Sequence, residues 1–401
     1  MNLKAGYPYS LIRHGIPFDY PKLEVDAETE VLVIGAGISG AVASHHLVEA
    51  GFDCMVIDSR SVGLGSTCAS TSLIQYEIDT PLHQLARKIG KQKAVKAYAM
   101  CADAITGLES LCRTTGNTLF TYKKSLQIAR HKKDIPALST ESKLRKENGF
   151  DTAFLEEEEL AERFGVNAPA GLLTALAGDM DAYLLTHQLL QFNRRRGLRV
   201  FDRTGAIHFR KSSKGHHVTT AEGKQIRCYF IVYANGYEAA KMVPAKLVDL
   251  RSTYVTISES LSNPPPHWGD DVLIWTTGDP YLYMRSTQDN RILVGGRDED
   301  LVSPARRDKL ISAKAKALKK DFSNLFPHIP FKTEFSWTGI FASTPDGLPI
   351  IGKLADRRTE YIMLGYGGNG IPFSLIAARI LTDLISGRSS PNAGLFSTGR
   401  L

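Results

Sequence analysis

Four residues between positions 31 and 58 have the types and the spacing that bind a dinucleotide. Gly35, Gly37 and Gly40 form a G-x-G-x-x-G turn after an apolar run at residues 31–34, and Asp58 closes a second apolar run. Gly35 allows a tight turn, Gly37 lets the backbone approach a pyrophosphate, and Gly40 lets a helix pack closely on the strand. Asp58 can accept hydrogen bonds from a ribose diol. The pattern therefore predicts a dinucleotide site.

A strand–helix–strand unit must position these residues. The run at residues 31–34 is typical of a buried strand, a small apolar helix follows the glycines, and a second strand ends at Asp58. The helix N-terminus offers free N–H groups and a positive dipole to phosphates. Directly after Asp58, residues 61–71 supply many glycines, serines and threonines. Such a loop can wrap a pyrophosphate and pass close to a flat ring system.

Helical and strand patterns alternate along the rest of the chain. We expect helices over residues 80–115, 134–164, 181–196, 305–322 and 371–386. We expect strands at residues 118–130, 199–201, 206–236, 250–298 and 361–364. The acidic run at residues 156–159 indicates a helix start. Residues 1–27 are rich in tyrosine, proline and phenylalanine, which predicts an extended arm packed on the body.

Bulk composition favours a soluble protein of two domains. The chain has 401 residues, of which 43% are hydrophobic and 23% charged. It lacks the ~18 unbroken apolar residues of a membrane span, and its N-terminus lacks the apolar core of a signal peptide. Five cysteines without a CxxC or metal-ligand spacing indicate reduced thiols, a cytoplasmic location and no metal site.

The net charge of +7 does not predict a nucleic-acid partner. Basic residues are spread along the chain, and the one cluster, at residues 194–196, ends an expected helix, where cations suit the helix dipole. The positive field can instead favour an anionic substrate.

Two further motifs lie near the C-terminus. Residues 337–352 read WTGIFASTPDGLPIIG, and residues 365–372 read GYGGNGIP. With the first motif and the Ala-Asn-Gly at 234–236, they resemble the D-amino-acid-oxidase-like family of FAD-dependent oxidoreductases, which includes glycine oxidase, sarcosine oxidase and dimethylglycine dehydrogenase. The resemblance covers most of the chain from about residue 28 onward.

The resemblance implies an α/β fold with a glutathione-reductase-like, FAD-binding Rossmann domain and an interleaved antiparallel-sheet substrate domain. Residues 28–79, 166–240 and 335–401 are assigned to the FAD-binding domain. Residues 80–165 and 241–334 are assigned to the substrate domain, and residues 1–27 to the N-terminal arm.

The resemblance also implies which residues contact FAD. In the family, the C-terminal glycine turn and the following helix meet the flavin ring, where the helix dipole would stabilise negative charge on the reduced ring. The candidate cofactor-binding residues are Gly35, Gly37, Ile38, Ser39, Gly40, Asp58, Ser59, Arg60, Gly65, Ser66, Thr67, Ala69, Ser70, Thr71, Ala206, Ala234, Asn235, Gly236, Gly339, Asp346, Gly367, Gly368, Asn369, Gly370 and Ile371.

This chain departs from the family at positions that bond the flavin. Gly339 stands where sarcosine oxidase has its flavin-linked cysteine, and Ala69 stands where dimethylglycine dehydrogenase has its flavin-linked histidine. We therefore expect non-covalent FAD.

Three family cations are also missing. Phe341 and Gly368 stand where glycine oxidase has two arginines, one of which grips the substrate carboxylate. Pro372 stands where sarcosine oxidase has a lysine that helps oxygen react. These differences weaken the prediction that the substrate carboxylate is bound in the usual clamp. They also weaken the prediction that oxygen is the electron acceptor.

A replacement clamp is predicted on the strand pair at residues 279–285 and 291–297, which in relatives lines the substrate side of the flavin. Strict alternation along a strand places Tyr281, Tyr283 and Arg285 on one face. A guanidinium there could bind a carboxylate through two hydrogen bonds.

Arg297 falls about where sarcosine oxidase has an active-site histidine. It either joins the clamp or forms a structural ion pair with Asp298 or Asp300. The candidate catalytic residues are Arg285, Arg297, Tyr283 and Tyr254.

The expected function is oxidation of a C–N bond in a small amine or amino acid by hydride transfer to flavin N5, with oxygen or another electron acceptor. One alternative is oxidation of a C–O bond in a hydroxy acid or polyol phosphate. The other is a non-catalytic or partner-dependent flavoprotein subunit.

Overall fold

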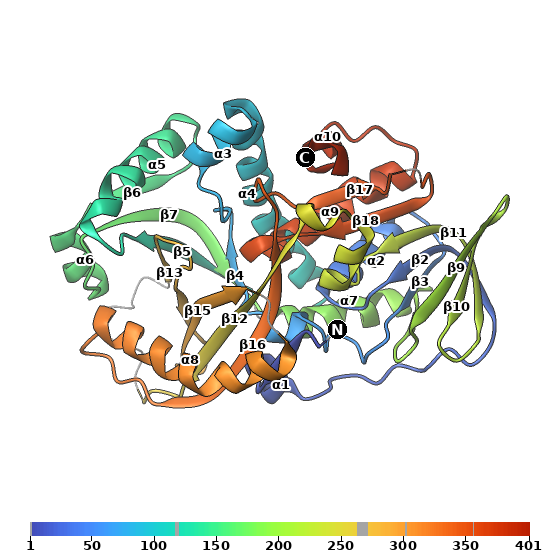
Figure 1. Cartoon of the computed structure of the whole chain (residues 1–401), viewed down its shortest axis with the longest axis horizontal. Helices are drawn as coiled ribbons and strands as arrows, with labels where there is room; N and C mark the ends of the chain where they lie inside the picture. Colours follow the sequence, from blue (N-terminus) through green and yellow to red (C-terminus); the bar gives the residue numbers. More distant parts are fainter. Residues whose placement is uncertain (1, 117–119, 263–271, 301–302, 356) are drawn as a thin grey trace.

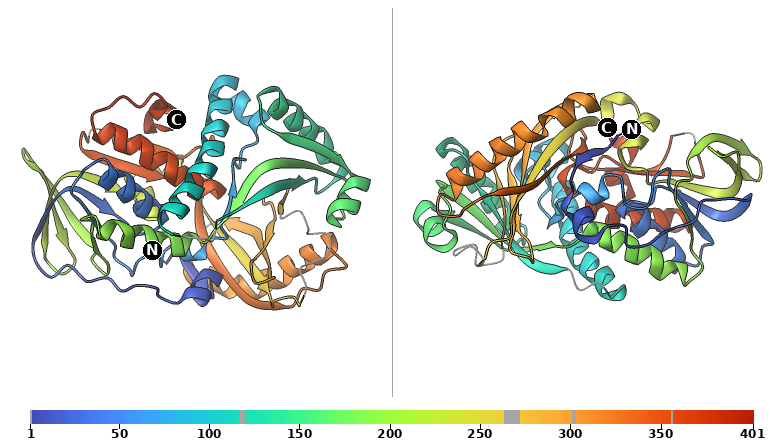
Figure 2. Two further views of the ribbon diagram at one scale, coloured as in Figure 1. Left: turned by 180° about the vertical axis from the view of Figure 1, so that it is seen from behind. Right: turned by 90° about the horizontal axis from the view of Figure 1, so that it is seen from below.

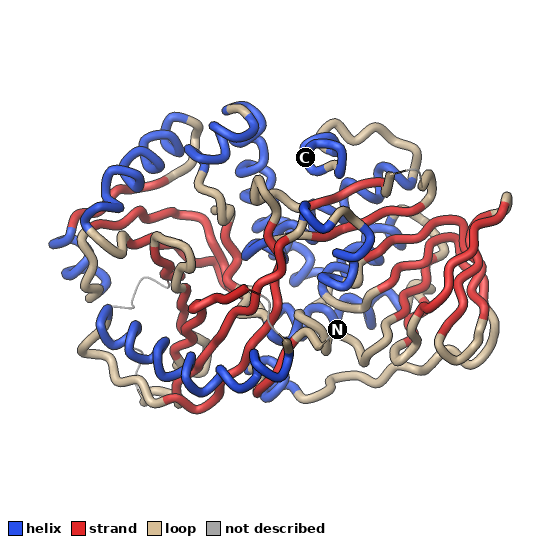
Figure 3. Tube along the Cα trace, viewed as in Figure 1, coloured by secondary structure: helices blue, strands red, loops and turns tan. Residues whose placement is uncertain are grey.

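The chain folds around two sheets that stand side by side (Figure 1). The computed structural model describes residues 2–116, 120–262, 272–300, 303–355 and 357–401. Views from behind and from below keep the two sheets apart (Figure 2), and helices flank the strands of both (Figure 3).

The first sheet is mainly parallel and carries the glycine motif. Its central order is β17-β18-β11-β2-β3-β8, and a β9–β10 hairpin extends it from β11. The strands are β2 (Ala27–Ile34), β3 (Cys54–Ile57), β8 (Arg199–Phe201), β9 (Ala206–Ser212), β10 (Gly215–Thr220), β11 (Gln225–Tyr233), β17 (Ile350–Lys353) and β18 (Glu360–Leu364).

Both faces of this sheet are buried, which explains the unbroken apolar runs of its strands. Val31 and Val33 of β2 face a core to which α2 (Ile38–Glu49), α7 (Ala182–Arg194) and α9 (Gly370–Ile385) contribute, together with the two helices that follow β4 in the chain. Leu32 and Ile34 face the opposite core, which includes side chains of β10 and of the N-terminal arm.

The second sheet is mainly antiparallel, in the order β1-β16-β12-β15-β14-β13-β5-β7-β4, with β6 also paired to β7. Its strands are β1 (Lys4–Gly6), β4 (Leu73–Gln75), β5 (Thr121–Ile128), β6 (Thr152–Glu156), β7 (Ala170–Asp179), β12 (Asp249–Ser258), β13 (Val272–Thr276), β14 (Tyr283–Ser286), β15 (Ile292–Asp300) and β16 (Thr333–Ser343). The helices associated with it are α3 (Leu82–Ile89), α4 (Lys91–Thr114), α5 (Ile135–Glu147), α6 (Glu157–Phe164) and α8 (Pro304–Leu325).

Several helix ends follow from local sequence. Asp181 caps α7 by accepting the Leu184 N–H at 2.9 Å, and Ser303 caps α8, which begins with a proline. The shorter elements are α1 (Tyr9–His14), α10 (Ala393–Phe396) and the 3₁₀ turns η1 (Thr67–Ala69), η2 (Lys132–Asp134), η3 (Gly236–Met242), η4 (Ala245–Leu247), η5 (Gly367–Asn369) and η6 (Thr398–Arg400). Of the helices described, none has the length and apolarity needed to cross a bilayer.

Several sequence expectations need correction. The helix expected over 134–164 is interrupted by β6, which pairs with β7. The strands β4, β7 and β16 belong to the second sheet, although the expected boundaries put them with FAD binding. The arm at 1–27 contains β1, which pairs with β16, and α1. These strands pair with segments that are distant in the sequence. A hydrophobic pattern indicates that a segment is a strand, but it does not indicate which other strand it pairs with. Residues 118 and 119 of an expected strand lie outside the described residues.

Candidate functional site

The glycine turn after β2 has no room for larger side chains. Gly35 has φ +116°, and a Cβ there would lie 2.4 Å from the Ala234 oxygen. A Cβ on Gly40 would lie 1.8 Å from the Gly35 oxygen. Gly40 therefore does not line the groove described below; it lets α2 pack against the turn.

The N-terminus of α2 is covered by the small-residue loop. Gly37 is the N-cap of this helix, and the Ile38 N–H donates to Thr67 Oγ1 at 3.0 Å. A Cβ on Gly37 would lie 2.8 Å from that same oxygen. Gly37, Ile38 and Ser39 nevertheless line the adjoining groove, so the N-terminus of α2 faces it, and such a terminus is the preferred place for a phosphate.

Asp58 occupies the end of β3 beside this turn. Its Oδ2 accepts the Ala36 N–H at 2.7 Å and its Oδ1 accepts the Arg60 N–H at 2.8 Å. Burial raises the pKa of Asp58, while both N–H groups favour its charged form. Arg60 forms a two-pronged ion pair with Glu238, at 2.8 and 3.2 Å. The second lone pair of each Asp58 oxygen leaves acceptors for a ribose diol.

These residues line one groove, which we call the cofactor groove. Leu3, Thr204 and Tyr366 also line it. Of the candidate cofactor-binding residues, it includes Gly35, Gly37, Ile38, Ser39, Asp58, Ser59, Arg60, Gly65, Ser66, Thr67, Ser70, Ala206, Ala234, Asn235, Gly236, Gly370 and Ile371.

Two polar atoms in the groove point to a missing ligand. Within the described structure, Ser66 Oγ and Asn235 Oδ1 are buried and have no hydrogen-bond partner. A buried polar atom left unsatisfied costs about 1–3 kcal/mol. Together with the open glycine backbone, they fit the phosphates and hydroxyls of a dinucleotide.

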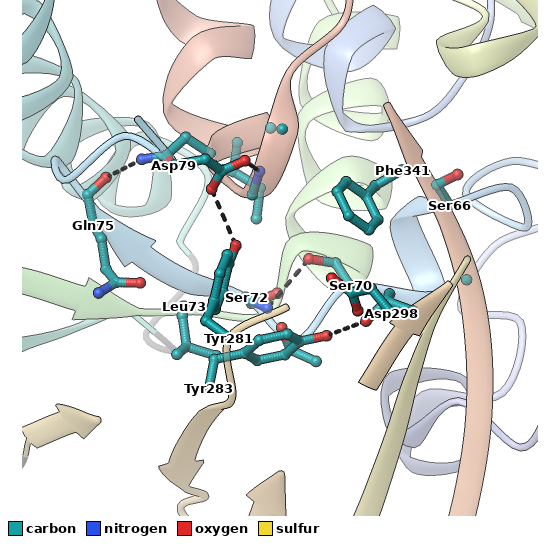
Figure 4. Close-up of a pocket in the computed structure, with 18 of the residues that line it drawn as sticks. Ser66, Ser70, Ser72, Leu73, Gln75, Asp79, Tyr281, Tyr283, Asp298 and Phe341 are labelled. Carbon is teal, nitrogen blue, oxygen red and sulfur yellow. Dashed lines mark hydrogen bonds between the residues drawn. The ribbon is translucent and has the colours of Figure 1, made fainter. Parts of the chain in front are cut away.

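A second hollow, which we call the inner cavity, adjoins the groove. The two share Ser66, Ser70, Tyr237, Gly370 and Ile371. The remaining candidate cofactor residues that line the inner cavity are Ala69, Thr71, Gly339, Gly367, Gly368 and Asn369. Its other walls include the side chains labelled in Figure 4, together with Trp275, Thr253 and Glu77.

Asp79 lies where the inner cavity meets the C-terminal glycine turn. Its Oδ2 accepts the Gly368 N–H at 2.8 Å, and its Oδ1 accepts the Tyr281 hydroxyl at 3.0 Å. A Cβ on Gly368 would lie 2.7 Å from both Asp79 Oδ1 and the Tyr281 oxygen. Burial raises the pKa of Asp79.

Asp298 faces the same cavity from β15 (Figure 4). Its Oδ1 is buried and has no hydrogen-bond partner in the described structure. Burial raises the pKa of Asp298 to about 6, and the charges of Asp79 and Asp279 add to the rise. The lining of the inner cavity, as far as the structure describes it, contains no lysine, arginine or histidine.

The predicted arginine clamp is wrong. Arg285 does not line the inner cavity; its Nε donates to the Thr71 oxygen at 2.8 Å and its Nη1 pairs with Asp179 at 3.2 Å. Arg297 binds Asp321 of α8 through two contacts, at 2.6 and 2.5 Å. The structural ion pair considered for Arg297 is therefore present, with a different aspartate.

A β-bulge in β15 explains why Arg297 does not reach the cavity. In the β12–β15 pairing, Ser252 opposes Glu299 and Tyr254 opposes Gly296, so the two residues 297 and 298 oppose one residue. Gly296 and Arg297 both have positive φ, +133° and +57°. A bulge shifts which side chains face each side of a sheet. It directs Asp298, rather than Arg297, into the cavity.

Three other predicted residues lie in different places relative to the two hollows. Tyr283 lines the inner cavity, and its hydroxyl is 3.0 Å from Thr253 Oγ1. Tyr254 is buried outside the cavity, with the Lys314 ammonium 5.1 Å from its ring centroid. Asp346 lines neither hollow, because it binds Arg400 at 2.8 and 3.0 Å. Its assignment as a cofactor residue is therefore wrong.

Sequence reasoning missed Asp79 and Asp298 as residues of the inner cavity. Asp79 follows a short strand with no motif around it, and Asp298 was considered only as a partner for Arg297. The Gly295-Gly296 pair was the available signal for Asp298, because glycines inside a strand pattern often mark a bulge.

A buried ion network anchors the loop that carries Asp79. Glu141 of α5 accepts the Leu82 and His83 N–H groups at 2.8 and 2.9 Å, at the start of α3. It also accepts Arg145 Nε at 2.8 Å. Burial alone would raise the pKa of Glu141, but the His83 hydrogen bonds and the Arg145 charge lower it to about 2.

We expect Glu141→Gln to lower the free energy of unfolding by about 3 kcal/mol at neutral pH, because it leaves the buried Arg145 charge underpaired. Since the folded-state pKa lies below the ordinary value of 4.5, this stabilisation is present above pH 4.5 and is lost as the pH falls toward 2. Urea unfolding of both proteins measures the difference. The control is Glu109→Gln, which removes an ion pair with Arg113 and should change the free energy of unfolding by less than about 0.5 kcal/mol. Equal losses of free energy in the two variants would contradict the anchoring role of Glu141.

Comparison with known proteins places this site in a family. The family model DAO, FAD dependent oxidoreductase, matches residues 30–384. Gamma-glutamylputrescine oxidoreductase of Escherichia coli K12 is 24% identical over 395 residues, 92% of this chain and 86% of that protein. A D-amino acid dehydrogenase of Vibrio atlanticus is 25% identical over 414 residues, 90% of this chain and 97% of that protein.

Solved structures share the fold. Glycine oxidase from Geobacillus kaustophilus superposes with a TM-score of 0.75 at 20% sequence identity, over 93% of this chain and 99% of that chain. This likeness confirms the expected α/β architecture, with a dinucleotide-binding sheet and a largely antiparallel sheet.

Proposed function

Because this chain belongs to the DAO family of FAD-dependent oxidoreductases, we propose that it oxidises the C–N bond of a small amine or amino acid in the inner cavity. The names of two relatives, a D-amino acid dehydrogenase and a gamma-glutamylputrescine oxidoreductase, support this substrate class. The observation that carries the proposal is the pair of carboxylates, Asp79 and Asp298, in a cavity whose described lining has no basic side chain. Such a cavity favours an amine over an anionic hydroxy acid or phosphate.

The residues of the cofactor groove would hold FAD, which would supply a two-electron hydride acceptor at N5, with oxygen or another acceptor as the final oxidant. Asp79 is placed to accept an N–H hydrogen bond from the amine, and the Gly368 N–H and Tyr281 hydroxyl hold its carboxylate in place. The neutral amine's lone pair assists hydride departure and forms an imine, with loss of the N–H proton. Water then hydrolyses the imine to a carbonyl compound and a free amine. This route depends on orientation more than on a strong base.

We also propose that FAD is held without a covalent bond. Ala69 and Gly339, which stand at the two positions that bond flavin in relatives, line the inner cavity and have no reactive atom. Burial raises the pKa of the neighbouring Cys68 thiol to about 11, which keeps it protonated and unreactive. Acid precipitation should release all the flavin into the supernatant; flavin that remains with the protein would contradict this.

The proposed reaction is tested by mixing the FAD-loaded protein, without oxygen, with matched panels of amines, amino acids, hydroxy acids and polyol phosphates. We expect members of the first two panels to bleach the flavin absorbance. Bleaching by hydroxy acids or polyol phosphates alone would instead favour C–O oxidation. Reduction by dithionite but by no panel member would favour a non-catalytic subunit.

The binding of a cation should depend on pH through Asp298. Burial, Asp79 and Asp279 raise its pKa to about 6, against the lowering effects of Thr253 and Arg251. We expect tetramethylammonium, whose charge does not titrate, to inhibit less strongly as the pH falls through about 6, because Asp298 becomes neutral. Inhibition constants for the wild type and Asp298→Asn measure this. A wild-type constant that does not change between about pH 8 and about pH 5 would contradict it.

A further inference from the structure

The described lining of the inner cavity contains the carboxylates Glu77, Asp79 and Asp298 and no basic side chain, and of the three Glu77 pairs with Arg145 behind the wall, at 3.5 Å. Asp79 reaches the cavity from the loop after β4, and Asp298 reaches it from the bulge in β15. The Arg251 guanidinium nearby is already bound to Asp249 and Asp279, each at 3.1 Å. Placing Asp79 and Asp298 in a cavity without a basic side chain beside them is unfavourable, so a ligand that supplies positive charge gains by entering.

A second observation concerns Asp298 itself. Its Oδ1 is buried, and no described residue gives it a hydrogen bond. Asp79 differs, because both of its oxygens have protein donors, from Gly368 and Tyr281. The two carboxylates therefore suit different tasks: Asp79 is fixed beside the glycine turn, and Asp298 has a free acceptor for a ligand's donor.

The inner cavity adjoins a second hollow, which we call the outer cavity. Asp134, Asp279 and Lys133 are among the residues that line the outer cavity. The residues that line both hollows are Asp79, Trp275, Tyr281, Asp298, Phe341 and Gly367. An extended ligand can therefore run from the glycine turn past Asp298 into the outer cavity.

The shared walls are aromatic. The rings of Trp275 and Tyr281 lie 6.0 Å apart edge to face, and those of Tyr281 and Tyr283 lie 5.9 Å apart. Aromatic faces contact methylene groups and attract ammonium ions. This wall suits an alkyl chain with a cationic end.

A carboxylate beside the reacting carbon has no anchor here. Arg285 and Arg297 are bound to Asp179 and Asp321, outside the cavity. The Asp79 carboxylate accepts the Gly368 N–H at 2.8 Å, and its negative charge would repel such an anion.

We infer that the substrate is an amine with a second positively charged group and without a carboxylate on the reacting carbon, the class of linear diamines and their N-substituted derivatives. The reacting nitrogen lies at Asp79 and the second cation at Asp298. This inference rests on the proposed function, since it concerns the same cavity and the same C–N bond.

The test compares diaminobutane with butylamine, which lacks the second cation, and with ornithine, which adds one carboxylate. Diaminopropane and diaminopentane extend the length series. Anaerobic flavin reduction gives kcat/KM, and titration of the flavin spectrum gives Kd. We expect the best diamine to exceed its matched monoamine and its carboxylated analogue by about 30-fold.

Asp298→Asn should bring the diamine-to-monoamine ratio close to unity. Asp300→Asn, the same change at an exposed position two residues along β15, should keep the wild-type ratio. The spectrum of bound flavin shows whether each variant is folded. Equal rates for butylamine and the diamines, or an unchanged ratio in Asp298→Asn, would overturn the inference and leave the proposed function standing. Reduction by hydroxy acids with none by any amine or amino acid would overturn both.

Discussion

Asp79→Asn is expected to lower kcat/KM for the best amine by about 100-fold, with most of the loss in kcat. The substitution keeps the shape of the side chain, so the hydrogen bond at the Gly368 N–H, now 2.8 Å, can persist. It removes the charge that orients the amine and receives its N–H. Stopped-flow flavin reduction without oxygen measures the step directly, free of any effect of the electron acceptor.

Asp249→Asn is the matched control. Asp249 is also an aspartate of this region, but its side chain is 59% exposed, pairs with Arg251 and lines neither cavity. We expect a change below about threefold, because exposed pairs contribute little. A reduction rate in Asp79→Asn within about threefold of the wild type would show that this carboxylate does not position the amine.

Gly37→Ala is expected to weaken FAD binding by about 100-fold, or about 2.7 kcal/mol. The new Cβ would lie 2.8 Å from Thr67 Oγ1, which is held by the Ile38 N–H. Either the Thr67 loop or the start of α2 must move, and both line the cofactor groove. Fluorescence titration of apoprotein with FAD measures the affinity.

Gly394→Ala provides the control for a general effect of the substitution. Nothing lies within 4 Å of a Cβ at Gly394, so FAD affinity should stay within about twofold of the wild type. Thermal unfolding of both apoproteins shows whether Gly37→Ala acts on folding. Unchanged FAD affinity in Gly37→Ala would contradict the placement of the pyrophosphate at this turn.

The cofactor side could be predicted from the sequence because its requirements are local. Glycine is required at positions 35 and 40 because a Cβ there would collide with the backbone of Ala234 and of Gly35. The spacing of the glycines in the sequence indicates this requirement directly. The assignment of Asp346 to cofactor binding rested on its local motif, whereas its hydrogen-bond partner, Arg400, lies 54 residues away. Nothing near Asp346 in the sequence indicates that pair.

The substrate side could not be predicted because it depends on strand geometry. The resemblance assigned Arg297 to the substrate side, but the bulge at Gly296 and Arg297 adds one residue to the strand. Asp298, and not Arg297, lines the inner cavity. The sequence therefore predicted a positively charged clamp for a carboxylate, whereas the structure places the carboxylates Asp79 and Asp298 in the cavity.

The central claim is that this chain uses FAD to break a C–N bond in the inner cavity. It is tested most directly by one anaerobic turnover with a limiting amount of diaminobutane, followed by measurement of reduced flavin, carbonyl product and released ammonia. Our account predicts equal molar amounts of the three. Flavin reduction without ammonia, or reduction by hydroxy acids while every amine and amino acid fails, would contradict it.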